Sequence, residues 1–294
     1  MIKKNYLSLF AKSFNWAGFF LPKKIYNDCA TLYAFCRVLD DMADEKADLD
    51  HKIGKFNEIR NFLKKSYDTN IKENHSSNEN EKIIHDVITL AENKNIKRII
   101  LEDLLDGVAS DLRKKIHIRS IKDLLVYSYR VAGTVGLMMA KILNVKKENS
   151  LKAAIDLGIA MQLTNIARDV IEDNKKNRRY IDSNFESIKN TLMTAETFYK
   201  SSFLSISDIS ITCRFAILVA RRVYRQIGGN ILKKRNIENY NKSGKIYVSN
   251  LGKFVQTILS VFDFLILLIM KAKGHDREAE HQIINEEINL NERI

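Results

Sequence analysis

Two acidic segments, far apart in the chain, have the residue types and spacing that hold divalent cations. The first, YAFCRVLDDMAD, covers residues 33–44 and places Asp40 and Asp44 four residues apart. The second, QLTNIARDVIED, covers residues 162–173 and repeats this spacing with Asp169 and Asp173. Residues four apart share one face of an α-helix. If both segments are helical, each therefore presents a pair of carboxylates on one side.

Such paired carboxylates need a compensating positive charge. Like charges at this spacing weaken an isolated helix by roughly 0.2–0.5 kcal/mol, and aspartate is a mediocre helix former. Mg²⁺ prefers oxygen ligands and binds through carboxylates together with substrate phosphates. Two facing carboxylate helices therefore predict a site for several Mg²⁺ ions and one or two diphosphates, where metal and arginine stabilise a departing diphosphate. Solvated acidic faces are the simpler explanation for either pair taken alone.

A carboxylate di-iron site is the competing metal centre for facing acidic helices. Such sites use Glu-x-x-His motifs, and neither acidic segment contains histidine. The histidines of the chain show no spacing typical of a ligand cluster; they are His51, His75, His85, His117, His275 and His281. The sequence therefore favours Mg²⁺.

Helix breakers are rare, with one proline and eleven glycines among 294 residues. These two residues end most helices, so their scarcity predicts an all-α protein. Ser120 is the expected N-cap of one helix, and the Gly228-Gly229 pair is the expected end of another. The apolar periodicity predicts helices over 24–47, 50–66, 81–92, 97–114, 120–143, 148–175, 184–201, 207–228 and 249–272.

No segment has the composition of an interdomain linker, so residues 1–272 are expected to form a single domain. Residues 66–81, SYDTNIKENHSSNENE, predict a flexible loop, and the polar residues 273–294 predict a frayed C-terminal tail. The apolar stretch 254–270, FVQTILSVFDFLILLIM, contains Gln256 and Asp263 and is short for a membrane span. A buried core helix is its expected role, and a helix lying on a bilayer surface is the alternative.

The formal net charge is +12, an excess that suits nucleic acid, anionic lipid headgroups or phosphate-bearing substrates. The basic residues are scattered and no nucleic-acid-binding motif accompanies them, which argues against nucleic acid. The chain has three cysteines, an odd number without metal-ligand spacing, which suits a reducing cytoplasm. The N-terminal residues lack the uninterrupted apolar core of a secretory signal.

These motifs resemble those of the phytoene/squalene synthase family, in particular of its bacterial phytoene synthases. YAFCRVLDDMADE resembles the first aspartate-rich motif of the family, and QLTNIARDVIEDNKKNRRYI resembles the second. YSYRVAGTVG at 127–136 and GVASDL at 107–112 resemble the segments between them, and the resemblance covers about residues 10–255. It implies a single-domain helical bundle of the isoprenoid-synthase type with a central cavity.

The resemblance implies a role for each matching residue. The metal ligands would be Asp40, Asp44, Asn165, Asp169 and Asp173. Residues that bind or orient substrate would be Ser13, Tyr33, Arg37, Asp41, Gln162, Arg168 and Tyr240. Tyr127 and Tyr129 would join the four aspartates as catalytic residues by facing a carbocation, whose charge an aromatic ring stabilises. Two tyrosines two residues apart cannot share a helix face, so packing in the core is the alternative for one of them.

The reaction implied is the Mg²⁺-dependent, head-to-head condensation of two geranylgeranyl diphosphates to phytoene through a cyclopropylcarbinyl diphosphate, a step of carotenoid biosynthesis. Farnesyl diphosphate, giving presqualene diphosphate, squalene or dehydrosqualene, is the alternative substrate, and a need for NADPH stays open. A non-catalytic, membrane-associated assembly protein with this fold is an alternative of another class. The residues expected to line a water-free tunnel for the cation are Ala132, Gly133, Met138, Met139, Ala140 and Leu163.

The expected cofactor is therefore two or three Mg²⁺ ions, with Mn²⁺ as a substitute. The expected partners are a prenyl diphosphate and, peripherally, a membrane, with no nucleic acid. A cytoplasmic location on the inner face of the membrane follows from these expectations, and both a monomer and a homodimer stay open.

Overall fold

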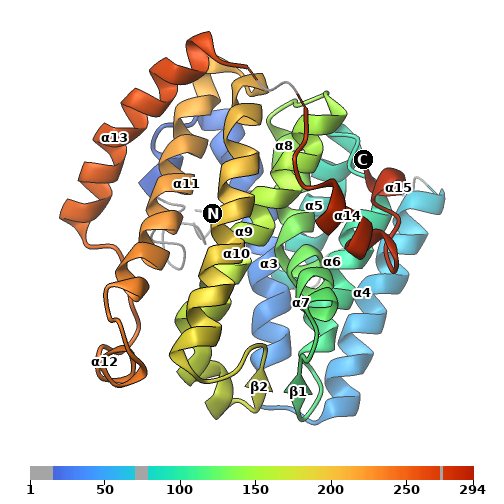
Figure 1. Ribbon diagram of the computed structural model, residues 1–294. Coiled ribbons are helices and arrows are strands. Elements are labelled where there is room, and N and C mark those ends of the chain that lie inside the picture. The colour runs from blue at the N-terminus through green and yellow to red at the C-terminus, as the bar shows by residue number, and fades with distance from the viewer. Residues whose placement is uncertain (1–15, 70–78, 272–273) are drawn as a thin grey trace.

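The computed structural model describes residues 16–69, 79–271 and 274–294, which form one helical bundle (Figure 1). The only strands among these residues are β1 and β2, which have two residues each and pair with each other in parallel. The prediction of a single all-α domain is confirmed. The elements are α3 (Lys23–Asp44), α4 (Leu49–Thr69), α5 (Glu79–Asn93), α6 (Arg98–Ser110), β1 (Ile116–His117), α7 (Ile121–Ser128), the π-helical turn η1 (Tyr129–Gly133), α8 (Thr134–Ile142), α9 (Glu148–Lys175), β2 (Arg178–Arg179), α10 (Phe185–Phe203), the 3₁₀ turn η2 (Leu204–Asp208), α11 (Ile211–Leu232), α12 (Ile237–Lys242), α13 (Asn250–Ile269), α14 (Glu278–Asn285) and α15 (Leu290–Arg293).

Helix α9, which contains the second acidic segment, is the central element of the bundle (Figure 1). It packs against α8, α10, α11 and η1. Glycines permit its closest contacts: a Cβ on Gly136 would lie 2.1 Å from the carbonyl oxygen of Ala154, and one on Gly158 would lie 2.2 Å from that of Ala132. Because no side chain fits in either gap, the backbones of η1, α8 and α9 can touch. The acidic pair at the end of α9 is thus held by a rigid core helix.

The helix expected over 120–143 runs from Ile121 to Ile142 and contains one wider, π-helical turn in its middle. Its predicted N-cap is confirmed, since the Ser120 side chain accepts a hydrogen bond from the backbone N–H of Asp123. The helix changes from α7 to the wider turn η1 at Tyr129 and then to α8 at Thr134. The residues of η1 pack against both α6 and α9. The prediction of a helix over this range is therefore confirmed, and the wider π-helical turn is a feature that the sequence did not predict.

Two predicted helix boundaries were also wrong. Helix α11 continues through Gly228-Gly229 to Leu232, because Gly228 packs closely against Leu192 inside the bundle. The chain turns only after the helix, at Arg235, which has a positive φ of 65°. The expected loop 66–81 is shorter than predicted, since α4 extends to Thr69 and α5 begins at Glu79. Residues 70–78 lie outside the described ranges.

The C-terminal residues are not the frayed tail that their polarity predicted. They form α14, which packs against α7, and α15, which follows it and contacts α14 (Figure 1). His281, Ile284, Ile288 and Leu290 are buried, and the first three recur at a helical spacing that the many intervening charges concealed. The segment therefore belongs to the folded domain.

The prediction that residues 254–270 form a buried core helix was wrong. They belong to α13, which lies along α11 at the outer edge of the bundle (Figure 1). Only Lys253, Ser260, Asp263 and Leu267 of this helix are buried. Among the described residues, α13 is the one helix whose length and apolar composition would suffice to cross a membrane.

Candidate active site

The two acidic segments meet in one polar cavity of about 300 Å³. Helix α3 provides Arg37, Asp40 and Asp44 from the first segment. Helix α9 provides the second set, and α6, α7 and β2 complete the wall. The lining residues from α9 are Gln162, Asn165, Ile166, Arg168, Asp169 and Asp173. The structure therefore brings together all five predicted metal ligands and three of the predicted substrate-binding residues.

Three of the carboxyl groups in this cavity, those of Asp40, Asp111 and Asp173, have pKa values raised chiefly by burial. The side chain of Asp40 faces the cavity, and protein atoms surround it on the other sides. The resulting desolvation raises its pKa to about 6, and the nearby charges of Asp44 and Asp111 also raise it. Desolvation and the charge of Asp169 raise the pKa of Asp173 to about 7. These carboxylates have too little positive charge near them, which is the condition that a bound cation relieves.

Asp44 and Asp169 are paired with basic side chains. Asp44 accepts hydrogen bonds from Lys176 at 2.7 Å and Arg178 at 2.9 Å, which outweigh its burial and lower its pKa. Asp169 is bound by Arg168 through two bonds of 2.8 and 2.6 Å. The cavity thus contains cations as well as carboxylates, and Arg178 and Lys176 link the end of the second segment to the first.

Asn165 provides an independent test of whether a metal ion fits. Its side-chain oxygen is buried without a hydrogen-bond partner, whereas its amide N–H₂ reaches Gln162 at 3.4 Å. A buried carbonyl oxygen without a partner is unfavourable by about 1–3 kcal/mol. Together with the carboxylates it forms an all-oxygen donor set, which suits a hard divalent cation. The residues present therefore fit Mg²⁺.

One polar network in the cavity was missed by sequence reasoning. Asp111 accepts hydrogen bonds from the hydroxyls of Tyr127 and Tyr180, each at 2.8 Å. The two tyrosine rings are stacked, with centroids 4.7 Å apart. Asp111 and Tyr180 both stand in segments that resemble the family, but no local spacing connects them with Tyr127. The pairing of β1 with β2 brings these residues together.

An apolar cavity of about 280 Å³ adjoins the polar one. The two share Cys36, Val131, Gln162 and Asn165 as lining residues. Tyr33 lines the apolar side, and its burial raises its pKa to about 12. Of the predicted tunnel residues, Ala132, Met139 and Ala140 line this cavity, whereas Gly133, Met138 and Leu163 do not. The site is thus a polar chamber that opens into an apolar one.

Two of the predicted site residues point elsewhere. Tyr129 is fully buried and its hydroxyl donates to Asp103, so it packs in the core and does not face the cavity. Tyr240 is buried, and its hydroxyl donates to the carbonyl oxygens of Ala167 and Arg168. Asn236 caps the short helix α12 and so fixes Tyr240 against α9. Neither tyrosine lines the polar or the apolar cavity, and for Tyr129 the structure agrees with the alternative of packing in the core.

The remaining two predicted residues have different outcomes. Asp41 is exposed outside the cavity and forms an ion pair of 2.5 Å with Arg37, which it can orient. Ser13 lies outside the described residues.

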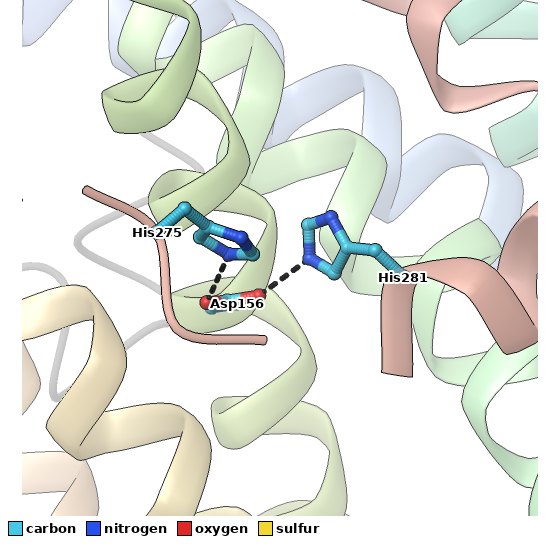
Figure 2. Close-up of side chains that lie close together, drawn as sticks. All are labelled: Asp156, His275 and His281. Atoms are coloured by element: carbon cyan, nitrogen blue, oxygen red, sulfur yellow. Dashed lines mark hydrogen bonds and ion pairs between the residues drawn. The ribbon is translucent and has the colours of Figure 1, made fainter. Parts of the chain in front are cut away.

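A histidine cluster exists in the C-terminal part of the chain, contrary to the expectation from spacing. Figure 2 shows His275 and His281 on either side of Asp156, at 2.9 and 2.7 Å from its two oxygens. Ser201 donates a third hydrogen bond to this carboxylate at 2.6 Å. The sequence did not reveal this cluster because Asp156 is more than a hundred residues from either histidine. None of these residues lines the polar cavity, so the cluster fastens the C-terminal segment to α9.

Comparison with known proteins agrees with this geometry. Residues 8–185 match the model of the squalene/phytoene synthase family. The chain is 31% identical to a 15-cis-phytoene synthase of Paracoccus sp. over 245 residues, covering 76% of this chain and 79% of the relative. It is 30% identical to a phytoene synthase of Cereibacter sphaeroides over 250 residues, covering 75% and 68% of the two chains.

Solved structures show the same fold. A dehydrosqualene synthase in complex with a ligand is similar with a TM-score of 0.71 and 26% identity, covering 87% of this chain and 93% of that one. A squalene synthase from Alicyclobacillus acidocaldarius has a TM-score of 0.66 at 17% identity, covering 80% and 91% of the two chains, and supports the fold alone. The fold, the paired aspartate motifs and these relatives agree, and the chain belongs to the squalene/phytoene synthase family of prenyltransferases.

Proposed function

We propose that this protein condenses two geranylgeranyl diphosphates head to head to give phytoene, in a Mg²⁺-dependent step of carotenoid biosynthesis. The observation that most supports this reaction is the junction of the two cavities. A diphosphate fits the chamber of carboxylates and cations, and an isoprenoid chain fits the adjoining apolar chamber. The relatives named phytoene synthases support the same reaction.

The ligands of the metal would be Asp40, Asp44, Asn165, Asp169 and Asp173. Bound Mg²⁺ would neutralise the diphosphate and so favour cleavage of the carbon–oxygen bond. Two or three ions fit the number of oxygen donors, and Mn²⁺ accepts the same ligands.

The residues of the chain have separate tasks in this reaction. Arg168 and Arg178 offer N–H donors to the diphosphate, and Arg guanidinium groups suit such oxygens. Tyr127 and Tyr180 offer aromatic faces beside the developing cation, held by Asp111. The apolar walls exclude the water that would capture the cation. The second prenyl double bond then attacks it, and loss of a proton closes the cyclopropane ring of a cyclopropylcarbinyl diphosphate. Departure of the second diphosphate, rearrangement of the resulting cation and loss of a second proton lead to phytoene.

The length of the apolar cavity supports a C20 substrate. Its lining on α9 extends from Asn165 to Ser150, and fifteen residues of helix span roughly 22 Å. A geranylgeranyl main chain of sixteen carbons, with C–C bonds of about 1.5 Å that each advance about 1.3 Å, measures roughly 20 Å. A farnesyl chain of twelve carbons measures roughly 15 Å on the same basis. Farnesyl diphosphate, with a C30 product, is the second candidate, because the solved dehydrosqualene synthase is similar at 26% identity.

The test is an incubation of the purified protein with Mg²⁺ and, separately, with geranylgeranyl or farnesyl diphosphate, followed by mass spectrometry of the hydrocarbon. We expect a C40 product that is lost in Asp40→Ala and Asp169→Ala but kept in Asp50→Ala, which changes an aspartate in the first turn of α4. A C30 product would retain the reaction and replace the substrate. No product from either diphosphate would favour a non-catalytic assembly protein.

We also propose peripheral membrane contact at the inner face, since the substrate is a lipid and α13 exposes apolar side chains.

A further inference from the structure

The two faces of helix α13 are reversed relative to those of an ordinary surface helix. Its polar face is turned toward the protein, and its apolar face is turned outward. Its polar side chains face the protein: Asp263 pairs with Arg222 of α11, and Gln256 donates to Gln226. Thr257 accepts a hydrogen bond from Trp16 at 2.9 Å. The two charged residues of the helix, Lys253 and Asp263, are both buried. The outward face of α13 therefore has no charged residue.

That outward face consists of large apolar side chains, which we call the α13 face. Half of the twenty residues of the helix are exposed apolar residues. Their exposed fractions range from 40% for Ile266 to 86% for Ile269. Single exposed apolar residues are ordinary, but soluble monomers rarely expose a contiguous patch of this kind. The members of the α13 face are Leu251, Phe254, Val255, Ile258, Val261, Phe262, Leu265, Ile266, Leu268, Ile269 and, next to the helix, Met270.

Basic residues stand in the chain segments that flank α13. Lys233, Arg235 and Lys242 are exposed before the helix, in a segment that also has the exposed Glu238, and Lys271 follows its end. Tyr247 is 59% exposed just before the helix, and such aromatic residues settle at membrane–water interfaces. An uncharged apolar stripe with a basic border matches an anionic bilayer surface, where apolar side chains enter the acyl region and lysines meet headgroups.

Aromatic contacts connect the α13 face with the wall of the apolar cavity. Phe264 on α13 contacts Phe215 on α11 with ring centroids 6.2 Å apart, and Phe215 contacts Phe20 at 5.0 Å. Leu21 and Ile217, which follow Phe20 and Phe215 closely in the chain, line the cavity. Phe19, at 74% exposed, extends the apolar surface on the outside. A series of aromatic contacts thus runs from α13 through α11 to residues next to the lining of the apolar cavity.

We infer that the α13 face docks on an anionic lipid bilayer, parallel to its surface, and that prenyl diphosphates reach the apolar cavity from that side. The second part rests on the proposed function, whereas the docking itself does not. A span across the bilayer does not fit this arrangement, because Arg222 and Gln226 bind the polar side of the helix to the bundle. The helix therefore lies on the membrane and stays in the bundle.

The test is co-flotation of the full chain with vesicles of phosphatidylglycerol and phosphatidylcholine, compared with vesicles of phosphatidylcholine alone. We expect binding to the anionic vesicles that weakens with salt, and at least about tenfold weaker binding in the double variant Phe262→Glu/Ile269→Glu. Both side chains are more than half exposed, so the variant should fold with an unchanged Tm. The matched control is Met193→Glu, which changes a residue 57% exposed on α10 and should bind as the original protein does.

Three results would overturn the inference: no binding of the original protein to anionic vesicles, equal binding of the double variant, or equal loss in the Met193→Glu control. A dimer in light scattering that the double variant abolishes would assign the α13 face to a second copy and overturn it as well. Activity on detergent-solubilised prenyl diphosphate separates this inference from the proposed function. The double variant should be as active as the original protein in detergent. When the substrate is presented in vesicles, its activity should be at least about tenfold lower than that of the original protein.

Discussion

Tyr180 illustrates how a residue without a recognisable local signal enters the site. Its hydroxyl donates to Asp111 at 2.8 Å, and its ring stacks on Tyr127. Burial, together with the charge of Asp111, raises the pKa of the Tyr180 hydroxyl well above its usual value, so the hydroxyl stays protonated as a donor. Because Asp111 and Tyr127 are themselves held in the cavity wall, Tyr180 fixes the geometry of the aromatic faces.

Replacing Tyr180 with phenylalanine removes one donor from a buried carboxylate and leaves the ring in place. A hydrogen bond to a charged group contributes about 1.5–3 kcal/mol, so we expect kcat to fall about tenfold or more. The Tm should also fall by several degrees, because the lost hydrogen bond stabilised the fold by about 1.5–3 kcal/mol, while the ring packing is kept. Tyr247→Phe, at an exposed position, is the control and should keep full activity. If Tyr180→Phe were as active as Tyr247→Phe, the hydrogen bond from Tyr180 to Asp111 would not be needed for activity.

At the scale of elements, the C-terminal segment is fastened at two places. His275 and His281 hold it to Asp156 of α9, and Arg293 binds Asp103 of α6 through contacts of 2.8 and 3.1 Å. Asp103 also accepts from Tyr129 in η1. The last two helices therefore brace the π-helical turn that lies between Tyr127 and the walls of the apolar cavity.

The fastening at Asp156 should depend on pH. Burial disfavours the charged imidazolium of His275, but the hydrogen bond and charge of Asp156 outweigh burial, so the pKa of His275 is raised. Burial acts against the charged form of Asp156 too, yet both histidines lower its pKa. The other groups beside His275 are Glu278, at 3.3 Å, and Lys152, which pairs with Glu278.

A raised histidine pKa means that the folded state binds the proton more tightly than the unfolded chain does. The stabilisation is fully present below the unfolded pKa of about 6.5 and is lost as pH rises through the folded value. We therefore expect the Tm to fall as pH is raised from about 6 to 9. Asp156→Asn should lower stability by about 3–5 kcal/mol and flatten this pH dependence. Asp276→Asn, in the same segment but exposed, is the matched control. A Tm profile equally steep in both variants would contradict the assignment.

For the molecule as a whole, two adjoining cavities, one polar and one apolar, lie along α9. The carboxylates stand near the C-terminal end of α9, and the apolar lining continues toward its N-terminal end at Ser150. In the proposed function, the isoprenoid chain would lie along this stretch of α9. The α13 face lies outside this chamber, separated from it by α11, so chain length and membrane docking are independent properties.

Ala153 lies in the far part of the cavity, about 18 Å along α9 from Asn165. Ala153→Leu should shorten the cavity and lower kcat/KM for geranylgeranyl diphosphate about tenfold or more, while the rate with farnesyl diphosphate is kept. The farnesyl rate serves as the internal control for folding, because overpacking the core would lower both rates. An unchanged ratio of the two rates would show that the chain does not reach Ala153.

The sequence by itself determined the features that depend on neighbours along the chain. The scarcity of proline and glycine predicted the helices, and the four-residue spacing of Asp40 with Asp44 and of Asp169 with Asp173 placed each pair on one face. Helical periodicity is a local property, so these predictions needed no knowledge of the partner. The two aspartate motifs are also long enough to indicate the family from their residues alone.

Only the tertiary structure decided which residues meet across the bundle. Tyr127 joins Tyr180, and Asp156 joins two histidines, because helix packing brings distant segments together at positions that no spacing encodes. Tyr129 and Tyr127 were equivalent in the sequence, and the π-helical turn buries one and leaves the other in the cavity. The apolar pattern of α13 likewise fitted a core helix as well as a surface one. Its place at the edge of the bundle settled that question, since burial depends on what lies opposite a helix and not on the helix alone.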